Sequence, residues 1–328
     1  MQKVYFRADA GYGIGYGHFI RSLALADILK EDYECTFFTV SPTEYQVGEM
    51  SNVCRYVDLK EETKLEDFLS FLKGDEIVIL DNYFFTTEYQ MQVKAKGCKL
   101  VCIDDMHDKH YVSDVVINHT PGTLPSYFSK EDYTNLYLGS EYLLFRKQFR
   151  EATHHYTSFK DNNNVYVCFG GSDELNFTRK VCEIIMRYAP SHIDVVVGGA
   201  YEFYDDLLSY AHGRDICVYK NATPELIVRL LRNARLAVVP DSMVFFEVCC
   251  LRRPVISGYD CDNQKFVSRY NQMHHLGCDI GDLLEDFEGK FLKAYKDMNI
   301  TAAVNYVYNQ TCVIKDTTNN LMDIFKTI

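Results

Sequence analysis

KVYFRADAGYGIGYGHFIRSLALADILKE, residues 3–31, contains the pattern from which the fold class follows. Its first part, KVYFRAD (3–9), is a short apolar run with β-branched and aromatic residues, which predicts a buried strand. Its last part, HFIRSLALADILKE (18–31), repeats apolar residues at a spacing near 3.6 and predicts an amphipathic helix. A Gly-rich turn joins the two, so the chain opens with a strand–turn–helix unit of an α/β protein.

The same alternation continues along the chain. Strands are expected at 34–40, 75–83, 98–106 and 114–119 and, after a polar stretch at 150–164, at 165–173, 192–199, 215–221, 235–242 and 254–259. The last stretch, 302–328, has a helical pattern and could pack back on the first domain. Continuous apolar strands between helices predict parallel sheets that are covered on both faces. The 328 residues suit two Rossmann-like domains, 1–150 and 164–328. Because parallel sheets bind ligands at the carboxyl ends of their strands, we expect the domains to face each other across a cleft.

Composition excludes several classes of protein. The formal net charge is −12 and no Lys/Arg stripe occurs, which argues against a nucleic-acid partner. The 12 Cys residues are scattered without a C-x-x-C pair, so we expect no structural zinc, no redox motif and no cofactor. No apolar run is long enough for a bilayer and the N-terminus shows no export pattern, so we expect a cytoplasmic protein without stable membrane insertion. The oligomeric state is left open.

The first Gly-rich turn places Gly11, Gly13, Gly15 and Gly17 before His18. The G-x-G-x-x-G spacing fails from every start and no G-K-S/T follows, so neither an NAD nor an ATP motif is supported. What remains is a His at the start of a helix, where the positive end of the helix disfavours a charged imidazole. The sequence therefore predicts His18 as a neutral base, beside the alternative that the turn only caps the helix.

Three further turns lie where strands end and helices begin in the second half of the chain. The first is Gly170, Gly171, Ser172 and Asp173, whose N–H groups suit a phosphate. The others span 240–243, before a helix that carries Glu247, and 260–264. The acidic protein can therefore still bind a diphosphate through backbone groups.

Motifs in these turns carry a resemblance to a known family. The pattern R-x-D-x-x-x-x-I-G-x-G-H-x-x-R-x-L-x-L-A is matched at Arg7, Asp9, Ile14, Gly15, Gly17, His18, Arg21, Leu23, Leu25 and Ala26. G-G-S/T-D-x-x-N is matched at Gly170, Gly171, Ser172, Asp173 and Asn176, and D-x-Y and D-D at Asp81, Tyr83, Asp104 and Asp105. Over residues 3–280 the chain resembles the UDP-sugar hydrolases of pseudaminic acid biosynthesis, relatives of the GT-B glycosyltransferases.

The resemblance implies a GT-B fold and a metal-independent reaction. Water would attack the anomeric carbon and release UDP and a free 2,4-diacetamido-2,4,6-trideoxyhexose with inversion. His18 would be the base, and Tyr83 and Asp9 would position water or sugar. The implied substrate and UDP contacts are Gly15, Gly17, Arg21, Gly170, Gly171, Ser172, Asp173, Asn176, Ser242, Glu247, Asn263 and Gln264. Among these, Ser242 would bind diphosphate, Glu247 the ribose, and Asn263 with Gln264 the sugar.

Several of these residues admit a second interpretation. DDMHDKH (104–110) suggests a metal site, but its crowded spacing is not diagnostic and a solvated loop is favoured. Asp9 could cap its turn through backbone N–H groups, and Glu247 could be a solvated helix residue. Asp241 departs from the family's small hydroxyl residues and would repel a diphosphate unless it points away.

Three functions remain open at this stage. The first is the UDP-sugar hydrolase, and the second is a GT-B glycosyltransferase in which His18 deprotonates a sugar hydroxyl. Acidic residues in 41–75 favour soluble chemistry over a membrane-bound acceptor. The third is a protein that binds sugar nucleotides without turning them over.

Overall fold

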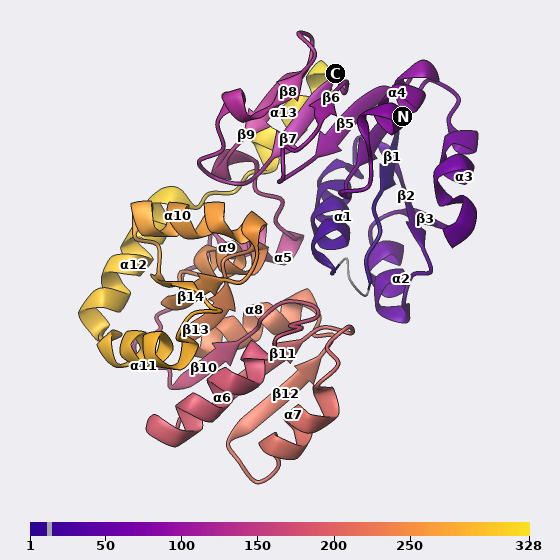
Figure 1. Ribbon diagram of the computed structural model, residues 1–328. Coiled ribbons are helices and arrows are strands. Elements are labelled where there is room, and N and C mark those ends of the chain that lie inside the picture. Colours follow the sequence, from indigo (N-terminus) through magenta and orange to yellow (C-terminus); the bar gives the residue numbers. More distant parts are fainter. Residues whose placement is uncertain (12–14) are drawn as a thin grey trace. The chain divides into compact units, whose positions relative to one another are not determined.

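The computed structural model describes residues 1–11 and 15–328 (Figure 1), and its contacts divide the chain into two compact units. The N-terminal unit is Met1–Lys147 with Thr317–Ile328, and the C-terminal unit is Gln148–Asp316. The last residues, which the expected range 164–328 assigned to the second domain, thus belong to the first. A helix that follows the C-terminal unit returns to the N-terminal one, as described below.

The N-terminal unit contains one seven-stranded sheet in which every neighbouring pair is parallel, in the order β3-β2-β1-β4-β5-β7-β9. From β1 to β5 this is the Rossmann order, whose direction reverses between β1 and β4. Its main elements are β1 (Lys3–Arg7), α1 (Gly17–Leu29), β2 (Glu34–Val40), α2 (Glu44–Ser51), β3 (Arg55–Leu59), α3 (Lys64–Phe71), β4 (Ile77–Leu80), α4 (Thr87–Ala95), β5 (Lys99–Ile103), β7 (Val115–Asn118), β9 (Asn135–Leu138) and α13 (Thr318–Thr327). The short strands β6 (His110–Tyr111) and β8 (Ser129–Lys130) form a separate parallel pair.

The C-terminal unit repeats this design with a six-stranded parallel sheet, β12-β11-β10-β13-β14-β15. Its order again reverses once, between β10 and β13. Its elements are β10 (Asn164–Val167), α6 (Phe177–Tyr188), β11 (Ile193–Val197), α7 (Tyr204–Ala211), β12 (Ile216–Lys220), α8 (Pro224–Asn233), β13 (Ala234–Pro240), α9 (Met243–Cys250), β14 (Val255–Tyr259), α10 (Lys265–His274), β15 (Cys278–Asp282), α11 (Phe287–Asp297) and α12 (Ile300–Val313). The helix α5 (Lys147–Ala152) begins where the first unit ends.

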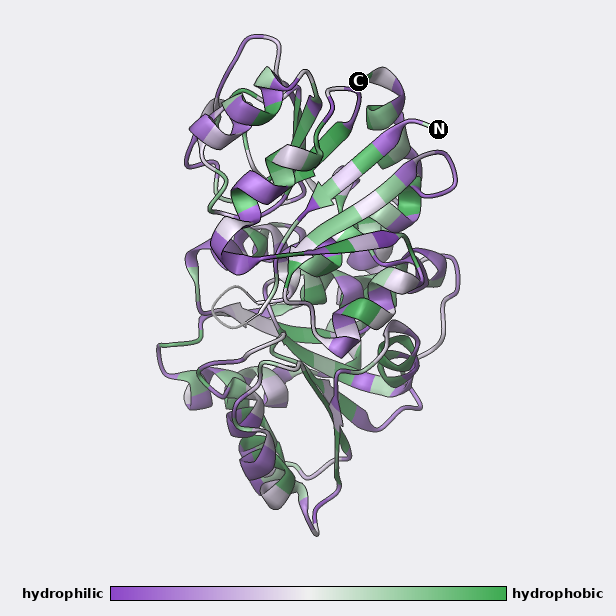
Figure 2. Cartoon of the chain, turned by 90° about the vertical axis from the view of Figure 1, so that its right-hand side faces the viewer, coloured by the Kyte–Doolittle hydropathy of each residue, from purple (hydrophilic) through white to green (hydrophobic). Residues whose placement is uncertain are grey.

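Strand composition accounts for the two cores. The interior strands β4 and β11 are buried along their whole length, as expected for parallel strands covered on both faces. Figure 2 shows hydrophobic residues concentrated on the strands, whereas hydrophilic residues lie mainly on helices and loops. Burial of these apolar side chains is the main favourable contribution to the stability of each unit.

The helix α1 is more buried than its expected amphipathic pattern allows. Most of its residues from His18 to Leu29 are buried, because α13 packs against it with Leu321, Ile324 and Phe325. The hydroxyl of Tyr33 also donates to the Phe325 carbonyl at 3.0 Å. The helical character expected for the chain end is confirmed by α12 and α13. Only α13 packs in the N-terminal unit, whereas α12 packs on α9 within the C-terminal unit.

None of the helices in the described part of the chain combines the length and apolar character needed to span a bilayer.

Candidate active site

His18 lies in the first turn of α1, at the carboxyl edge of the first sheet. Its Nδ1 is 2.7 Å from Asp81 Oδ1, and Asp81 directly follows β4, the strand beside β1. The imidazole is only 5% exposed. Because the strand order reverses between β1 and β4, this pair occupies the switch point where such sheets bind ligands.

The ionisation of Asp81 fixes the tautomer of His18. Burial alone would raise the pKa of Asp81, but the charge of Arg21 and the hydrogen bonds from Arg21 and His18 outweigh burial and lower it, so the carboxylate is ionised. An ionised carboxylate only accepts hydrogen bonds, so the ring nitrogen 2.7 Å away carries the proton. Nδ1–H therefore donates to Asp81, and Nε2 is the ring nitrogen that this contact leaves available to a substrate. A histidine held in this way by a buried carboxylate is arranged to act as a base.

Arg21 holds the carboxylates in place. It donates from Nε and Nη2 to Asp81 at 2.8 and 2.6 Å, and from Nη1 to Asp105 at 2.7 Å. Its Nη2 also lies 3.0 Å from His18 Nδ1. Arg21, expected to contact the substrate, is itself buried and engaged with these two carboxylates.

The prediction of a solvated loop after β5 is wrong for its first two residues. Asp104 and Asp105 are both buried. Asp105 pairs with Arg21, and Asp104 accepts from the backbone N–H groups of Met106 and His107. The sequence contained these residues as a motif, but the burial of Asp105 involves Arg21 of α1, which is far from β5 in the chain.

His119 is a second buried imidazole at this edge, and sequence reasoning missed it. It directly follows β7, and burial together with the charge of Arg21 lowers its pKa to about 4. The ring is therefore neutral. Its Nδ1 makes no hydrogen bond within the described part of the chain. The signal available in the sequence was its position at the end of a predicted strand, like that of Asp81.

Tyr83 borders His18 as expected. Its ring lies edge-on to the imidazole with 4.6 Å between ring centroids. At 43% exposure Tyr83 is far more accessible to solvent than His18, which is 5% exposed. This position suits a residue that orders water or sugar beside the base.

Asp9 has a different environment. Its carboxylate pairs with both terminal nitrogens of Arg7 and accepts from the Val40 N–H at 3.1 Å. Its own N–H donates to Asn82 Oδ1 at 2.7 Å. These contacts join the ends of β1, β2 and β4, which favours the second interpretation given above, a structural role in the turn.

The structure describes the first and last residues of the Gly-rich turn before α1. Gly11 and Gly15 exchange backbone hydrogen bonds of 3.2 and 2.9 Å, and Gly15 has a φ of +74° that favours glycine. Gly17 begins α1. Gly13 and Ile14, which belong to the predicted motif, lie outside the described residues.

In the C-terminal unit, the turn after β10 leads into α6. Asp173 accepts from the N–H groups of Phe177 and Thr178, and Asn176 accepts from Arg179 N–H and from the Tyr201 hydroxyl. Burial raises the pKa of Asp173 to about 6. Both side chains thus cap the helix, although they were expected to contact the nucleotide, and the partly exposed Gly170, Gly171 and Ser172 remain beside them.

Close packing fixes the path of this turn. Gly198 follows β11, and a Cβ added there would lie 2.5 Å from the Gly171 carbonyl oxygen. Gly170 has a φ of +84°. Glycines at these positions allow the backbone N–H groups of the turn to lie at the carboxyl edge of the sheet, at its β10/β13 switch point.

Ser242 follows β13 at the same switch point and caps α9, where its Oγ accepts from Val244 N–H. The preceding Asp241 is fully buried. Burial, followed by the negative charge of Asp279, raises the pKa of Asp241 well above its ordinary value. A protonated Asp241 does not carry the charge that would repel a diphosphate.

Asp241→Asn should reduce the pH dependence of stability. The folded protein holds a proton that the unfolded side chain, with a pKa of about 3.9, releases. The free energy of unfolding of the parent therefore falls as the pH rises from about 4 to the pKa that Asp241 has in the folded protein. The asparagine side chain does not titrate, so the variant does not lose stability in this way. Each pKa unit corresponds to about 1.4 kcal/mol. Melting temperatures from pH 4.5 to 8 should show the variant gaining on the parent as the pH rises. The exposed Asp132→Asn serves as control, and equal slopes in all three proteins would contradict this assignment.

The remaining predicted residues lie near the same edge. Glu247 is buried in α9, so the solvated interpretation is wrong, because both faces of this helix are covered. Asn263 and Gln264 lie in a short 3₁₀ turn after β14, where Gln264 Oε1 accepts from Asp260 N–H at 3.1 Å. Since β10, β13 and β14 are parallel neighbours, these turns meet at one edge of the second sheet.

Two Rossmann-like units with this strand order define the GT-B fold, and comparisons with solved structures confirm it. MurG of Acinetobacter baumannii matches with a TM-score of 0.66 at 10% identity, covering 100% of both chains. Alr3699/HepE of Anabaena, solved in complex with UDP, matches with a TM-score of 0.63 at 11% identity, also covering 100% of both. At this level of identity the likeness concerns the fold.

Comparison with curated proteins finds relatives. The chain is 26% identical over 277 residues to the uncharacterized protein MJ1062 of Methanocaldococcus jannaschii, covering 80% of this chain and 57% of that protein. It is 25% identical over 289 residues to the spore coat polysaccharide biosynthesis protein SpsG of Bacillus subtilis, covering 85% and 84%. It is 27% identical over 201 residues to the UDP-2,4-diacetamido-2,4,6-trideoxy-beta-L-altropyranose hydrolase of Campylobacter jejuni, covering 55% and 64%. The chain thus spans less than two thirds of the first and third relatives. No family model matches the chain.

Proposed function

We propose that the chain is a UDP-sugar hydrolase that releases UDP and a free 2,4-diacetamido-2,4,6-trideoxyhexose, as a step of nonulosonic acid biosynthesis. The observation that carries the proposal is His18, whose Nδ1 is held by an ionised Asp81 so that Nε2 is the nitrogen left to act as a base at the switch point of the first sheet. Similarity to the Campylobacter jejuni hydrolase and to SpsG supports the substrate class.

The reaction needs one displacement. Water attacks the anomeric carbon, the bond from that carbon to the β-phosphate oxygen breaks, and its electron pair leaves with UDP. The water proton passes to His18 Nε2, and the resulting imidazolium is stabilised by Asp81, whose geometry Arg21 maintains. Tyr83 would order the water or the sugar beside the ring.

The C-terminal unit would bind UDP. Backbone N–H groups of Gly170, Gly171 and Ser172 and the hydroxyl of Ser242 would hold the diphosphate, since both turns end strands at one switch point. Glu247 would bind the ribose, and Asn263 and Gln264 the sugar. Glycines 15 and 17 would allow the substrate to approach α1 closely.

A GT-B glycosyltransferase is the second candidate, favoured by the structural likeness to that fold. In a glycosyltransferase, His18 would deprotonate an acceptor hydroxyl instead of water. The side chains proposed above to bind UDP and to hold His18 would have the same roles.

Incubation of the protein with UDP-sugars and no acceptor separates the two. We expect ¹H and ³¹P NMR to show UDP and a free sugar, with the first anomer inverted relative to the substrate. UDP release that strictly requires an added sugar or lipid acceptor would favour transfer and overturn the hydrolase. Saturable binding of UDP-sugars with no product under either condition would overturn both enzymes.

A further inference from the structure

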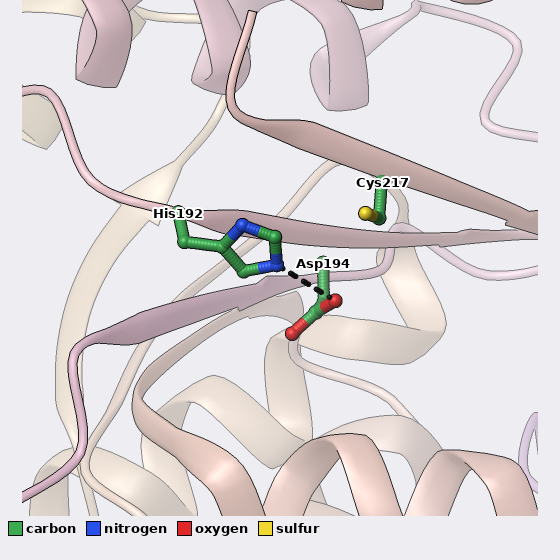
Figure 3. Close-up of side chains that lie close together, drawn as sticks. All are labelled: His192, Asp194 and Cys217. Atoms are coloured by element: carbon green, nitrogen blue, oxygen red, sulfur yellow. Dashed lines mark hydrogen bonds and ion pairs between the residues drawn. The ribbon is translucent and has the colours of Figure 1, made fainter.

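Three potential metal ligands gather at the opposite edge of the second sheet. His192 directly precedes β11, Asp194 is the second residue of β11, and Cys217 is the second residue of β12. Their ligand atoms all lie within 4.8 Å of one another. Figure 3 shows the imidazole beside the Asp194 carboxylate, with the Cys217 sulfur nearby. This edge holds the amino ends of the strands, whereas the proposed UDP turns lie at their carboxyl ends.

The strand register brings the three side chains together. Side chains two residues apart share one face of a strand, so His192 and Asp194 point the same way. Asp194 and Cys217 are Cα partners in the parallel β11–β12 pair, which places them side by side on that face. The backbone of the sheet therefore preorganises the cluster, which does not depend on a flexible loop.

Neighbouring groups are arranged as they are around protein-bound metals. His192 Nδ1 lies 2.6 Å from Asp215 Oδ1, which leaves Nε2 directed at Asp194 Oδ1, 3.2 Å away. A carboxylate on the far nitrogen is the usual outer contact of a metal-bound histidine. The second oxygen of Asp194 accepts from Asn164 Nδ2 at 3.0 Å, which fixes the buried carboxylate.

We propose that His192, Asp194 and Cys217 bind a Zn²⁺ ion, with water in the fourth position. Thiolate, imidazole and carboxylate together match zinc better than magnesium or calcium. Two ligand atoms on a tetrahedral zinc lie ~3.3 Å apart, close to the observed His192–Asp194 separation. The exposed Cys217 sulfur needs to move by only about 1 Å, and its exposure leaves the fourth position open.

Zinc here would join the edge strand β12 to β11 and stabilise the C-terminal unit. The ion takes the place of a proton on Nε2, and its double positive charge partly offsets the carboxylates of Asp194 and Asp215 and the Cys217 thiolate. The sequence contains no C-x-x-C pair, so no structural metal site was expected from it. The cluster has no such local signature, because Cys217 lies on a different strand from His192 and Asp194.

The test uses the full chain, freed of metal with EDTA and then given Zn²⁺ or Co²⁺ alone. After removal of unbound metal, mass spectrometry should find one zinc per chain, and Co²⁺ should give a thiolate charge-transfer absorption in the near ultraviolet. Cys217→Ser should remove that absorption and the stoichiometric zinc. Asp215→Asn should weaken zinc binding by about 10–100-fold.

Matched controls keep the result interpretable. Cys312→Ser changes another exposed cysteine, on α12, and should bind zinc like the parent. His192→Gln supplies a second ligand deletion, and circular dichroism checks that each variant is folded. Zinc far below one per chain in the parent, or equal zinc and Co²⁺ absorption in Cys217→Ser, His192→Gln and Cys312→Ser, would overturn the proposal.

Discussion

His18→Gln should lower the turnover of a UDP-sugar by about 10²–10⁴-fold, the usual contribution of a positioned general base. Glutamine can occupy the same space and remains neutral, but it cannot accept the proton of an attacking water. UDP does not need the imidazole, since its proposed contacts lie in the C-terminal unit. We therefore expect the dissociation constant of UDP, measured by calorimetry, to change less than threefold.

His155→Gln is the matched control, because His155 is exposed and lies outside the proposed site. It should keep the parent's rate. A His18→Gln enzyme that retains its rate within a fewfold would remove His18 from the reaction. A parallel loss of UDP affinity would instead make His18 a nucleotide contact.

Asp81→Asn should reduce turnover to a similar degree, on the order of 10²–10⁴-fold, although Asp81 does not touch the substrate. An amide in place of the ionised carboxylate can donate to Nδ1, which favours the tautomer with the proton on Nε2 and removes the base. It also withdraws the charge that stabilises the imidazolium. Because the loss concerns the rate, kcat should fall while KM changes little.

Asp105→Asn distinguishes this effect from general damage. Both substitutions remove a buried carboxylate from Arg21, so both should destabilise the fold, by about 3–5 kcal/mol for a broken buried pair. Only Asp81 contacts His18, so Asp105→Asn should lose much less activity at a temperature where both variants are folded. Equal losses of kcat in the two variants would contradict the role given to the Asp81 carboxylate.

Local patterns were sufficient to predict most elements of the fold. The strand expected at 34–40 is β2, and the helix expected at 18–31 is α1 with bounds shifted by one or two residues. Continuous apolar runs such as β4 correctly indicated parallel sheets. The burial of α1 was not predictable, because the helix that covers it lies at the other end of the chain.

Residues of the candidate site that belong to one local motif could be predicted from the sequence. Contacts between residues on separate strands could not. His18 follows from the Gly-rich turn, and Tyr83 and Asp81 from one short motif. The pairing of Asp81 and Asp105 through Arg21 depends on which strands are neighbours, which local sequence does not specify. The neutral state of Asp241 likewise follows from burial and from Asp279, on a strand two places away in the sheet.

The claim that His18 delivers water to a glycosyl carbon is tested most directly by turnover in H₂¹⁸O. Mass spectrometry at early times should find ¹⁸O in the free sugar and none in the released UDP, because the bond that breaks joins carbon to oxygen. Incorporation of ¹⁸O into a phosphate oxygen of UDP would mean attack at phosphorus and would contradict the account.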